Sequence, residues 1–177
     1  MNILLAGSVK ESVDEKYKKE AEKLVQYISK KRYNVICCAD KECKSILGRI
    51  YKRLITEGKV KVFFTIPKIY ENEMKDFSYK IDKIFNSSEE RTNFCLKQAD
   101  ISIFLPGGIG TLYELLCAIE TNRSGEFKSK ILIINSYGYF DKLLEMLEEV
   151  YKENFANPKD KNTYIVINNI EEVEKYL

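Results

Sequence analysis

The sequence contains no histidine among its 177 residues. Without histidine, no Ser-His-Asp or Cys-His arrangement can form, and most zinc sites lose a common ligand. The sequence also lacks an apolar run of about 18 residues, so it predicts no transmembrane helix. Without histidine we therefore expect no metal site and no catalysis that uses histidine as the base.

The sequence also has no large excess of positive or negative charge. The chain has 29 lysines and arginines against 27 aspartates and glutamates, which gives a net charge of +2. This balance provides no electrostatic reason to expect a nucleic acid or a membrane surface as a partner.

Five cysteines are present without a secretory signal pattern before them. The first stretch, MNILLAGSVKESVDEKY, has a short apolar piece and no basic region before it, so we expect a first strand there. We therefore predict free thiols in a reducing compartment, and a cytoplasmic protein. Cys37, Cys38 and Cys43 lie close together, but their spacing fits no common zinc pattern.

Segments with the period of a strand alternate with segments that have the period of a helix. This alternation predicts a Rossmann-like α/β fold over residues 1–177, a single domain whose doubly wound parallel sheet carries helices on both faces. Residues 70–86 are ambiguous and are expected to form a short helix or an irregular excursion. The strands are expected at residues 2–7, 33–39, 59–67, 101–105, 130–135 and 163–168.

The stretch FLPGGIGTLYELL, residues 104–116, joins a predicted strand to a predicted helix through three glycines. In a parallel sheet, ligands bind beyond the carboxyl ends of the strands, where these glycines lie. Gly107 and Gly108 can take positive φ and leave backbone N–H groups uncovered. Thr111 adds a hydroxyl in the first helical turn, and the helix dipole favours an anion there. The turn is therefore predicted to bind a phosphate.

Glu114 lies one turn into the same predicted helix. The buried stripe of this helix is expected to consist of Leu112, Leu115, Leu116 and Ile119, so that Glu114 faces back over the strand ends. A carboxylate there could act on the sugar or the scissile bond of a bound phosphate ester. In the alternative interpretation, the glycines only make a tight turn and Glu114 is a first-turn residue favoured by the dipole.

The first interpretation has two structural requirements. The Glu114 carboxylate must not be held in the interior by an ion pair, and the amides of residues 107–111 must not be capped by neighbouring atoms.

The longer pattern PGGIGTLYE matches Pro-Gly-Gly-x-Gly-Thr-x-x-Glu in full. It resembles the signature of the Lonely-guy family, cytokinin riboside 5′-monophosphate phosphoribohydrolases that have often been labelled lysine decarboxylase-like. The segment SEERTNFCLKQAD resembles the family helix Glu-Arg-Lys-x-x-Met-x-x-x-Ala-Asp and places the family arginine at Arg91. Three further segments, LLAGS, FFTIPKIY and KILIINSYGYFDKLLEML, resemble family strands and turns in the same order.

The resemblance implies a Rossmann-like domain that forms a homodimer and needs no cofactor. It also implies hydrolysis of the N-glycosidic bond of a nucleoside 5′-monophosphate, with a purine as the expected base, to give the free base and ribose 5-phosphate. The catalytic pair falls on Arg91 and Glu114, and the phosphate loop on Gly107, Gly108, Gly110 and Thr111.

Four further residues are candidates because they lie at or near predicted strand ends. Gly7 and Ser8, at the end of the first strand, are candidates for binding phosphate or sugar, although a simple strand-end turn is an equal alternative. Tyr113 and Tyr137 are near enough to strand ends to stack on a base.

The sequence departs from the family pattern after its second strand. The family has a Tyr-Gly-Gly-Gly loop there, whereas this chain has VICCADKECKSILG, so we expect the side chains of Asp40 and Lys41 in the space of the ribose or phosphate. This departure supports an alternative function, a nucleotide or phosphate-ligand sensor or carrier without turnover. Related folds that carry molybdenum cofactor use a similar glycine turn, so a pterin ligand is a variant of that alternative.

Overall fold

The alternation of strands and helices produces a seven-stranded sheet in the computed structural model, which describes residues 1–177. All strand pairs are parallel, in the order β4-β3-β2-β1-β5-β6-β7. The α/β fold class predicted from the sequence is confirmed. The strands are β1 (Asn2–Ala6), β2 (Asn34–Cys38), β3 (Val62–Pro67), β4 (Lys83–Phe85), β5 (Ile101–Phe104), β6 (Lys130–Ile134) and β7 (Tyr164–Ile167).

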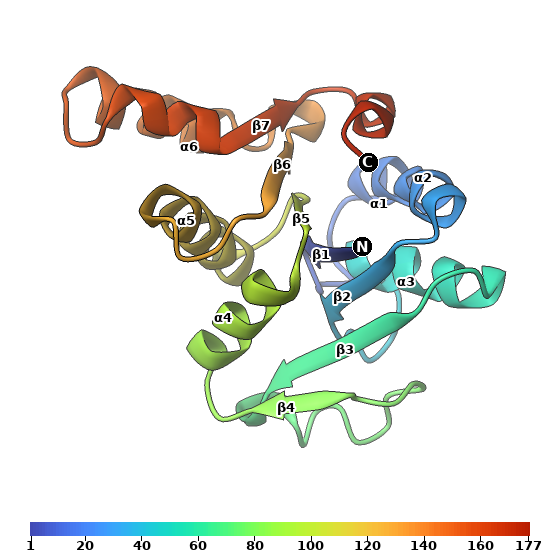
Figure 1. Ribbon diagram of the computed structural model, residues 1–177. Coiled ribbons are helices and arrows are strands. Elements are labelled where there is room, and N and C mark those ends of the chain that lie inside the picture. Colours follow the sequence, from blue (N-terminus) through green and yellow to red (C-terminus); the bar gives the residue numbers. More distant parts are fainter.

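Helices cover both faces of this sheet (Figure 1). They are α1 (Glu15–Glu22), α2 (Leu24–Lys31), α3 (Ile46–Glu57), α4 (Ser88–Gln98), α5 (Ile109–Ser124) and α6 (Asp141–Lys152). A core cluster of 25 buried residues joins the sheet to α1, α2 and α3, and a second cluster of 13 joins it to α4, α5 and α6. Because β1 is central and the order of strands reverses between β1 and β5, a switch point opens at their carboxyl ends.

Local signals in the sequence correctly identify several helix ends. The Ser87 hydroxyl accepts a hydrogen bond from the Glu90 N–H at 3.1 Å, which is the cap predicted from their spacing. Gly58 ends α3 with a φ of 66°, a conformation that glycine adopts without strain. Apolar residues at helical spacing over residues 13–31 predict one helix, but the structure divides this segment into α1 and α2 at Lys23.

Strand β4 was not predicted, because its three residues carry no periodic pattern. Residues 68–70 form a short 3-10 turn, and the chain then crosses to the edge of the sheet, where Ile84 pairs with Ile66. The Asp82 carboxylate accepts a hydrogen bond from the Phe64 N–H at 2.8 Å just before this strand. The ambiguous segment is thus partly irregular, as expected, and partly an edge strand.

A carboxylate closes the loop that leads into α3. The Asp40 side chain accepts hydrogen bonds from the N–H groups of Glu42, Lys44 and Ser45 at 2.9–3.2 Å. The Ser45 hydroxyl caps α3 by accepting from the Gly48 N–H at 3.1 Å. Several donors at the start of this helix are therefore satisfied from within the chain.

This arrangement modifies the expectation for Asp40 and Lys41. Asp40 does occupy an anion position, but the position belongs to α3, and Lys41 instead binds the Asp76 carboxylate at 3.0 Å. Neither side chain covers the glycine turn, because no atom of a neighbouring segment lies within 4 Å of the place where a Gly108 Cβ would stand.

All five cysteines are free thiols, as predicted. No helix has both the length and the apolar character needed to cross a membrane.

We predict that Gly48→Ala destabilises the fold although alanine is the better helix former. A Cβ at Gly48 would lie 2.3 Å from an Asp40 carboxylate oxygen and 2.6 Å from the backbone of Cys43. Overpacking of this kind costs about 1–3 kcal/mol, more than the roughly 1 kcal/mol gained in propensity. Urea denaturation measures the difference. Gly110→Ala is the matched control, since this first-turn glycine of α5 has open space around it, and its free energy of unfolding should not fall. Equal stability of both variants would contradict the prediction.

Candidate active site

The glycine turn lies at the switch point of the sheet, between the end of β5 and the start of α5. The Ser8 N–H donates to the Pro106 carbonyl at 3.0 Å, and the Ser8 carbonyl accepts from the Leu47 N–H at 3.3 Å. Ser8 therefore connects the turn to the start of α3. A Cβ on Gly7 would stand 3.0 Å from the Leu105 Cβ, so close packing explains this glycine without a ligand.

Gly107 and Gly108 do not have the backbone conformation that the sequence suggested. Positive φ occurs at Gly58, Gly125 and Gly138 but not at Gly107 or Gly108, so that expectation is wrong. Gly107 is required for another reason, since its Cβ would lie 2.1 Å from the Thr111 hydroxyl oxygen. Around Gly108 and Gly110 the Cβ positions are open, which leaves the backbone accessible.

The N–H groups of residues 108–111 have no hydrogen-bond partner within the chain. The first helical bond of α5 runs from the Leu112 N–H to the Gly108 carbonyl at 3.1 Å, and no side chain caps this helix. The Thr111 hydroxyl also makes no bond within the chain and is not sealed from solvent. The second structural requirement, that neighbouring atoms do not cap these amides, is therefore met. A cluster of free donors at a helix N-terminus is able to bind an anion.

Arg91 and Glu114 form a buried ion pair next to this turn. Arg91, on α4, donates from Nη1 to Oε1 of Glu114, on α5. The side chains retain only 7% and 11% of their exposure, respectively. The structure thus brings together the two residues that the sequence assigned to catalysis, although they lie 23 positions apart.

This pair contradicts part of the prediction for α5. Glu114 lies on the buried face of the helix, whereas Leu116 is 45% exposed and Leu112 only half-buried. The first requirement, a carboxylate free of an interior ion pair, is therefore not met. The buried face of α5 was predicted wrongly because apolar residues occur on nearly every side of this helix. The helical spacing of apolar residues alone therefore does not determine which face is buried.

The ion pair keeps the Arg91 guanidinium charged. Burial alone would lower the pKa of Arg91, but the adjacent Glu114 charge outweighs it and raises that pKa above its usual value. Burial raises the pKa of the nearby Cys38 thiol despite an opposing effect of Arg91, so this thiol stays protonated.

Each partner also keeps one polar atom available to a ligand. Oε2 of Glu114 and Nη2 of Arg91 form no hydrogen bond within the chain, and neither is fully buried. The carboxylate is therefore oriented by the arginine through one oxygen, while the other oxygen remains free.

Thr65 is the site residue that the sequence did not reveal. Its hydroxyl and its carbonyl accept hydrogen bonds from Arg91 Nε at 2.9 and 3.2 Å, and the residue is completely buried on β3. Thr65 thereby fixes the guanidinium plane against the sheet. The only signal in the sequence is a hydroxyl residue inside the apolar strand VFFTIP.

The spacing of the turn and the pair suits a phosphate ester of a sugar. Thr111 and Glu114 are three residues apart on α5, and residues at this spacing lie about 5–6 Å apart on one side of a helix. A phosphate on the free amides would therefore place an attached sugar close to the carboxylate.

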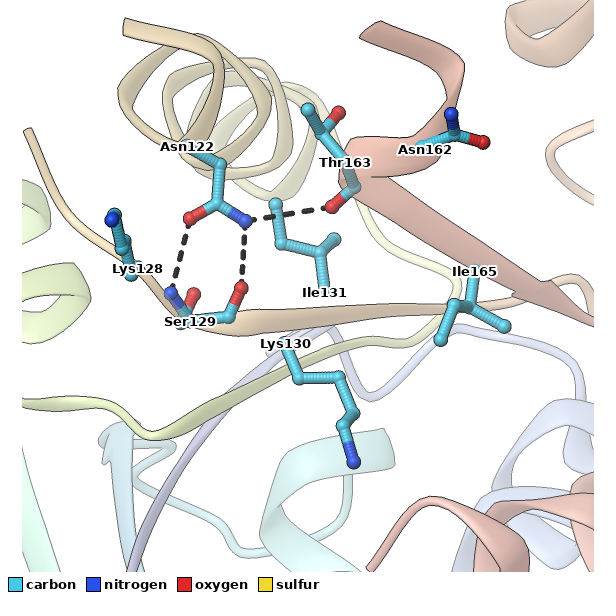
Figure 2. Close-up of a pocket in the computed structure, with 8 residues that line it drawn as sticks. All are labelled: Asn122, Lys128, Ser129, Lys130, Ile131, Asn162, Thr163 and Ile165. Atoms are coloured by element: carbon cyan, nitrogen blue, oxygen red, sulfur yellow. Dashed lines mark hydrogen bonds between the residues drawn. The ribbon is translucent and has the colours of Figure 1, made fainter. Parts of the chain in front are cut away.

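A hollow of about 440 Å³ at the other end of the strands is a poorer candidate (Figure 2). The Asn122 side chain already bonds to the N–H and carbonyl of Ser129 at 3.0 and 2.6 Å and to the Thr163 carbonyl at 3.4 Å. Lys130 is directed to the carbonyl of Tyr176 at 2.7 Å. The polar side chains that line this hollow are thus engaged in hydrogen bonds to the backbone. The glycine turn is therefore the better candidate for the functional site.

Comparison with known proteins shows which family the chain resembles. Residues 47–177 match the model of a family described as "Possible lysine decarboxylase". The chain is 31% identical over 91 residues to the "Probable cytokinin riboside 5'-monophosphate phosphoribohydrolase LOG4" of Oryza sativa subsp. japonica, covering 51% of this chain and 40% of the relative. It is 27% identical over 133 residues to the "Cytokinin riboside 5'-monophosphate phosphoribohydrolase LOG1" of Arabidopsis thaliana, covering 75% and 62%. The matches span about half the length of these relatives.

Solved structures confirm the fold. The Moco carrier protein from Chlamydomonas reinhardtii superposes with a TM-score of 0.70 at 14% identity, over 99% of this chain and 93% of that one. The molybdenum cofactor binding protein from Rippkaea orientalis gives 0.59 at 13% identity, over 99% and 92%. Since the family model covers most of the chain and includes both the glycine turn and the ion pair, the chain belongs to the Lonely-guy family of "possible lysine decarboxylase" proteins.

Proposed function

We propose that this protein hydrolyses the N-glycosidic bond of a nucleoside 5′-monophosphate, with a purine as the expected base. One observation carries the proposal: the free N–H groups of residues 108–111 lie one helical turn from the Arg91–Glu114 pair. The relatives named as cytokinin riboside 5′-monophosphate phosphoribohydrolases support the same reaction class.

The reaction has a plausible path through these groups. The bond between C1′ and the base breaks, the electron pair leaves with the base, and water adds its oxygen to C1′ to give ribose 5-phosphate. Such a reaction passes through an oxocarbenium-like transition state. The free Oε2 of Glu114 would stabilise this cation and accept the proton of the water, which finally resides on the base. Arg91 orients the carboxylate and can neutralise charge on the departing base.

The ion pair changes the role that the sequence gave to Glu114. Arg91 holds Oε1 of the Glu114 carboxylate in place, so that only Oε2 is free to act on the substrate. Electrostatic stabilisation of the transition state, which needs a fixed negative charge, suits such a carboxylate better. We therefore assign Glu114 mainly to stabilisation of the cation.

We expect the purified protein to release free base from AMP or another purine nucleoside monophosphate. Chromatography of reactions with AMP, GMP, CMP and UMP would detect the base, and adenosine is the control because it has no phosphate to bind. If none of the four nucleotides yields free base, the proposed activity is wrong.

Glu114→Gln should lower the rate of base release at least about 100-fold, because the negative charge is lost while the shape is kept. The buried Arg91 then lacks its counter-ion, so we also expect the free energy of unfolding to fall by about 1–3 kcal/mol. Calorimetric titration with inorganic phosphate should still detect binding, which shows that the variant is folded. A folded variant with unchanged turnover would remove Glu114 from the mechanism.

A second candidate function is a carrier or sensor that binds a phosphate ligand without turnover. It is favoured by the buried Glu114 carboxylate and by the Asp40 carboxylate that fills the start of α3. Under this alternative, AMP or a pterin phosphate would raise the melting temperature, and chromatography would recover the ligand unchanged.

We also propose that the protein forms a homodimer through the exposed face of α5. Ile109, Tyr113 and Leu116 are 82%, 39% and 45% exposed and follow one another at helical spacing. An apolar stripe of this kind beside a binding site is typical of a surface that packs against another protein surface.

Leu116→Glu should convert the dimer to a monomer, because it places a charge at the centre of the contact. Light scattering after size-exclusion chromatography would show the mass fall by half. The free energy of unfolding of the monomer unit should change little, since Leu116 is exposed within one chain. A wild-type protein that is already monomeric at about 50 μM would contradict this assignment.

A further inference from the structure

We propose that Tyr139 is a positioning residue for the glycine turn. Its hydroxyl donates a hydrogen bond to the carbonyl of Gly107, the residue just before the free amides. This inference rests on one part of the proposed function, the binding of an anion by residues 108–111, and it does not depend on turnover.

The bond acts through the geometry of one peptide unit. In a planar trans peptide, the carbonyl of one residue and the N–H of the next point in opposite directions. When Tyr139 holds the Gly107 carbonyl on its own side, the Gly108 N–H must point away from the tyrosine. Tyr139 thus fixes the direction of the first donor without touching the anion itself.

A glycine pair needs such a restraint more than other residues would. Both residues flanking this peptide lack a Cβ, so steric contacts limit its rotation less than they limit other peptides. A flipped peptide would direct the Gly107 carbonyl toward the anion in place of the Gly108 N–H, and that arrangement repels a phosphate. The Thr111 hydroxyl restricts only the space above Gly107.

The turn that carries Tyr139 is itself rigidly held. Its ring contacts the rings of Tyr17 and Phe140 edge-on, with centroids 5.8 and 5.0 Å apart. The Asn135 side chain accepts from the Phe140 N–H at 2.7 Å and donates to the Asp141 carboxylate at 2.8 Å.

Within this turn, Tyr137 takes a φ of 57° and Gly138 a φ of 69°. A tyrosine in the left-handed region costs free energy and persists only where its surroundings enforce it. The strained turn therefore delivers the Tyr139 hydroxyl to a fixed position beside the glycine turn.

Tyr139→Phe tests this role because it removes only the hydroxyl. Calorimetric titration with inorganic phosphate, and with AMP, should give a dissociation constant about 2- to 10-fold higher than in the wild type, the effect of one hydrogen bond. Where base release is measurable, KM should rise by a similar factor with little change in kcat, since the cradle binds the phosphate equally before and during the reaction. A loss of fold alone would not produce this split.

Tyr17→Phe is the matched control, because the Tyr17 ring packs against the Tyr139 ring. The Tyr17 hydroxyl, which this variant removes, makes no hydrogen bond within the chain. The phosphate affinity of this variant should equal that of the wild type. The inference is overturned if Tyr139→Phe also binds phosphate as the wild type does, or if the wild type binds no phosphate. If phosphate binding weakens in Tyr139→Phe but no nucleotide releases its base, the inference stands and the proposed activity fails.

Discussion

The buried ion pair between Arg91 and Glu114 is the interaction on which the site depends. Removing two charges from water is costly, and a pair of this kind is often no more stabilising than apolar residues of the same size. Here, additional hydrogen bonds from Arg91 to Thr65 offset part of that cost and fix the guanidinium against β3. The pair joins the N-terminal parts of α4 and α5, one helical turn beyond the free amides of α5. A costly pair in this position is better explained by chemistry than by stability.

Two helix N-termini meet near the carboxyl end of β1, and the chain treats them differently. At α3 the Asp40 carboxylate and the Ser45 hydroxyl already accept hydrogen bonds from donors at the helix start, so fewer N–H groups remain there for an anion. At α5 the donors are free, and the Tyr139 hydroxyl restrains the peptide before them. This asymmetry leaves the chain with one amide cluster at the switch point for a phosphate. The Asp40 loop stands where the family has a Tyr-Gly-Gly-Gly loop after its second strand, as the sequence comparison with the family pattern indicated.

Much of the fold could be predicted because hydrophobic period, caps and glycines act locally, as at Ser87 and Gly58. Motif resemblance pointed to Arg91 and Glu114, which the structure brings together as an ion pair, and the glycine turn was found from its place after β5. The rest depends on contacts between distant segments. Thr65 is 26 positions from Arg91, and no local pattern reveals their bond. The rotation of α5, which buries Glu114 and exposes Leu116, is set by packing because both faces of that helix are apolar in sequence.

The central claim is that a phosphate on residues 108–111 directs its sugar to Glu114. A crystal structure of the protein with AMP bound in the wild type, or in an inactive variant if the nucleotide is consumed, tests it most directly. The account predicts phosphate oxygens within hydrogen-bond distance of the N–H groups of residues 108–111, and C1′ of the ribose next to the free oxygen of Glu114. Phosphate bound at the start of α3 or in the hollow near Asn122, or a ribose that faces away from Glu114, would contradict it.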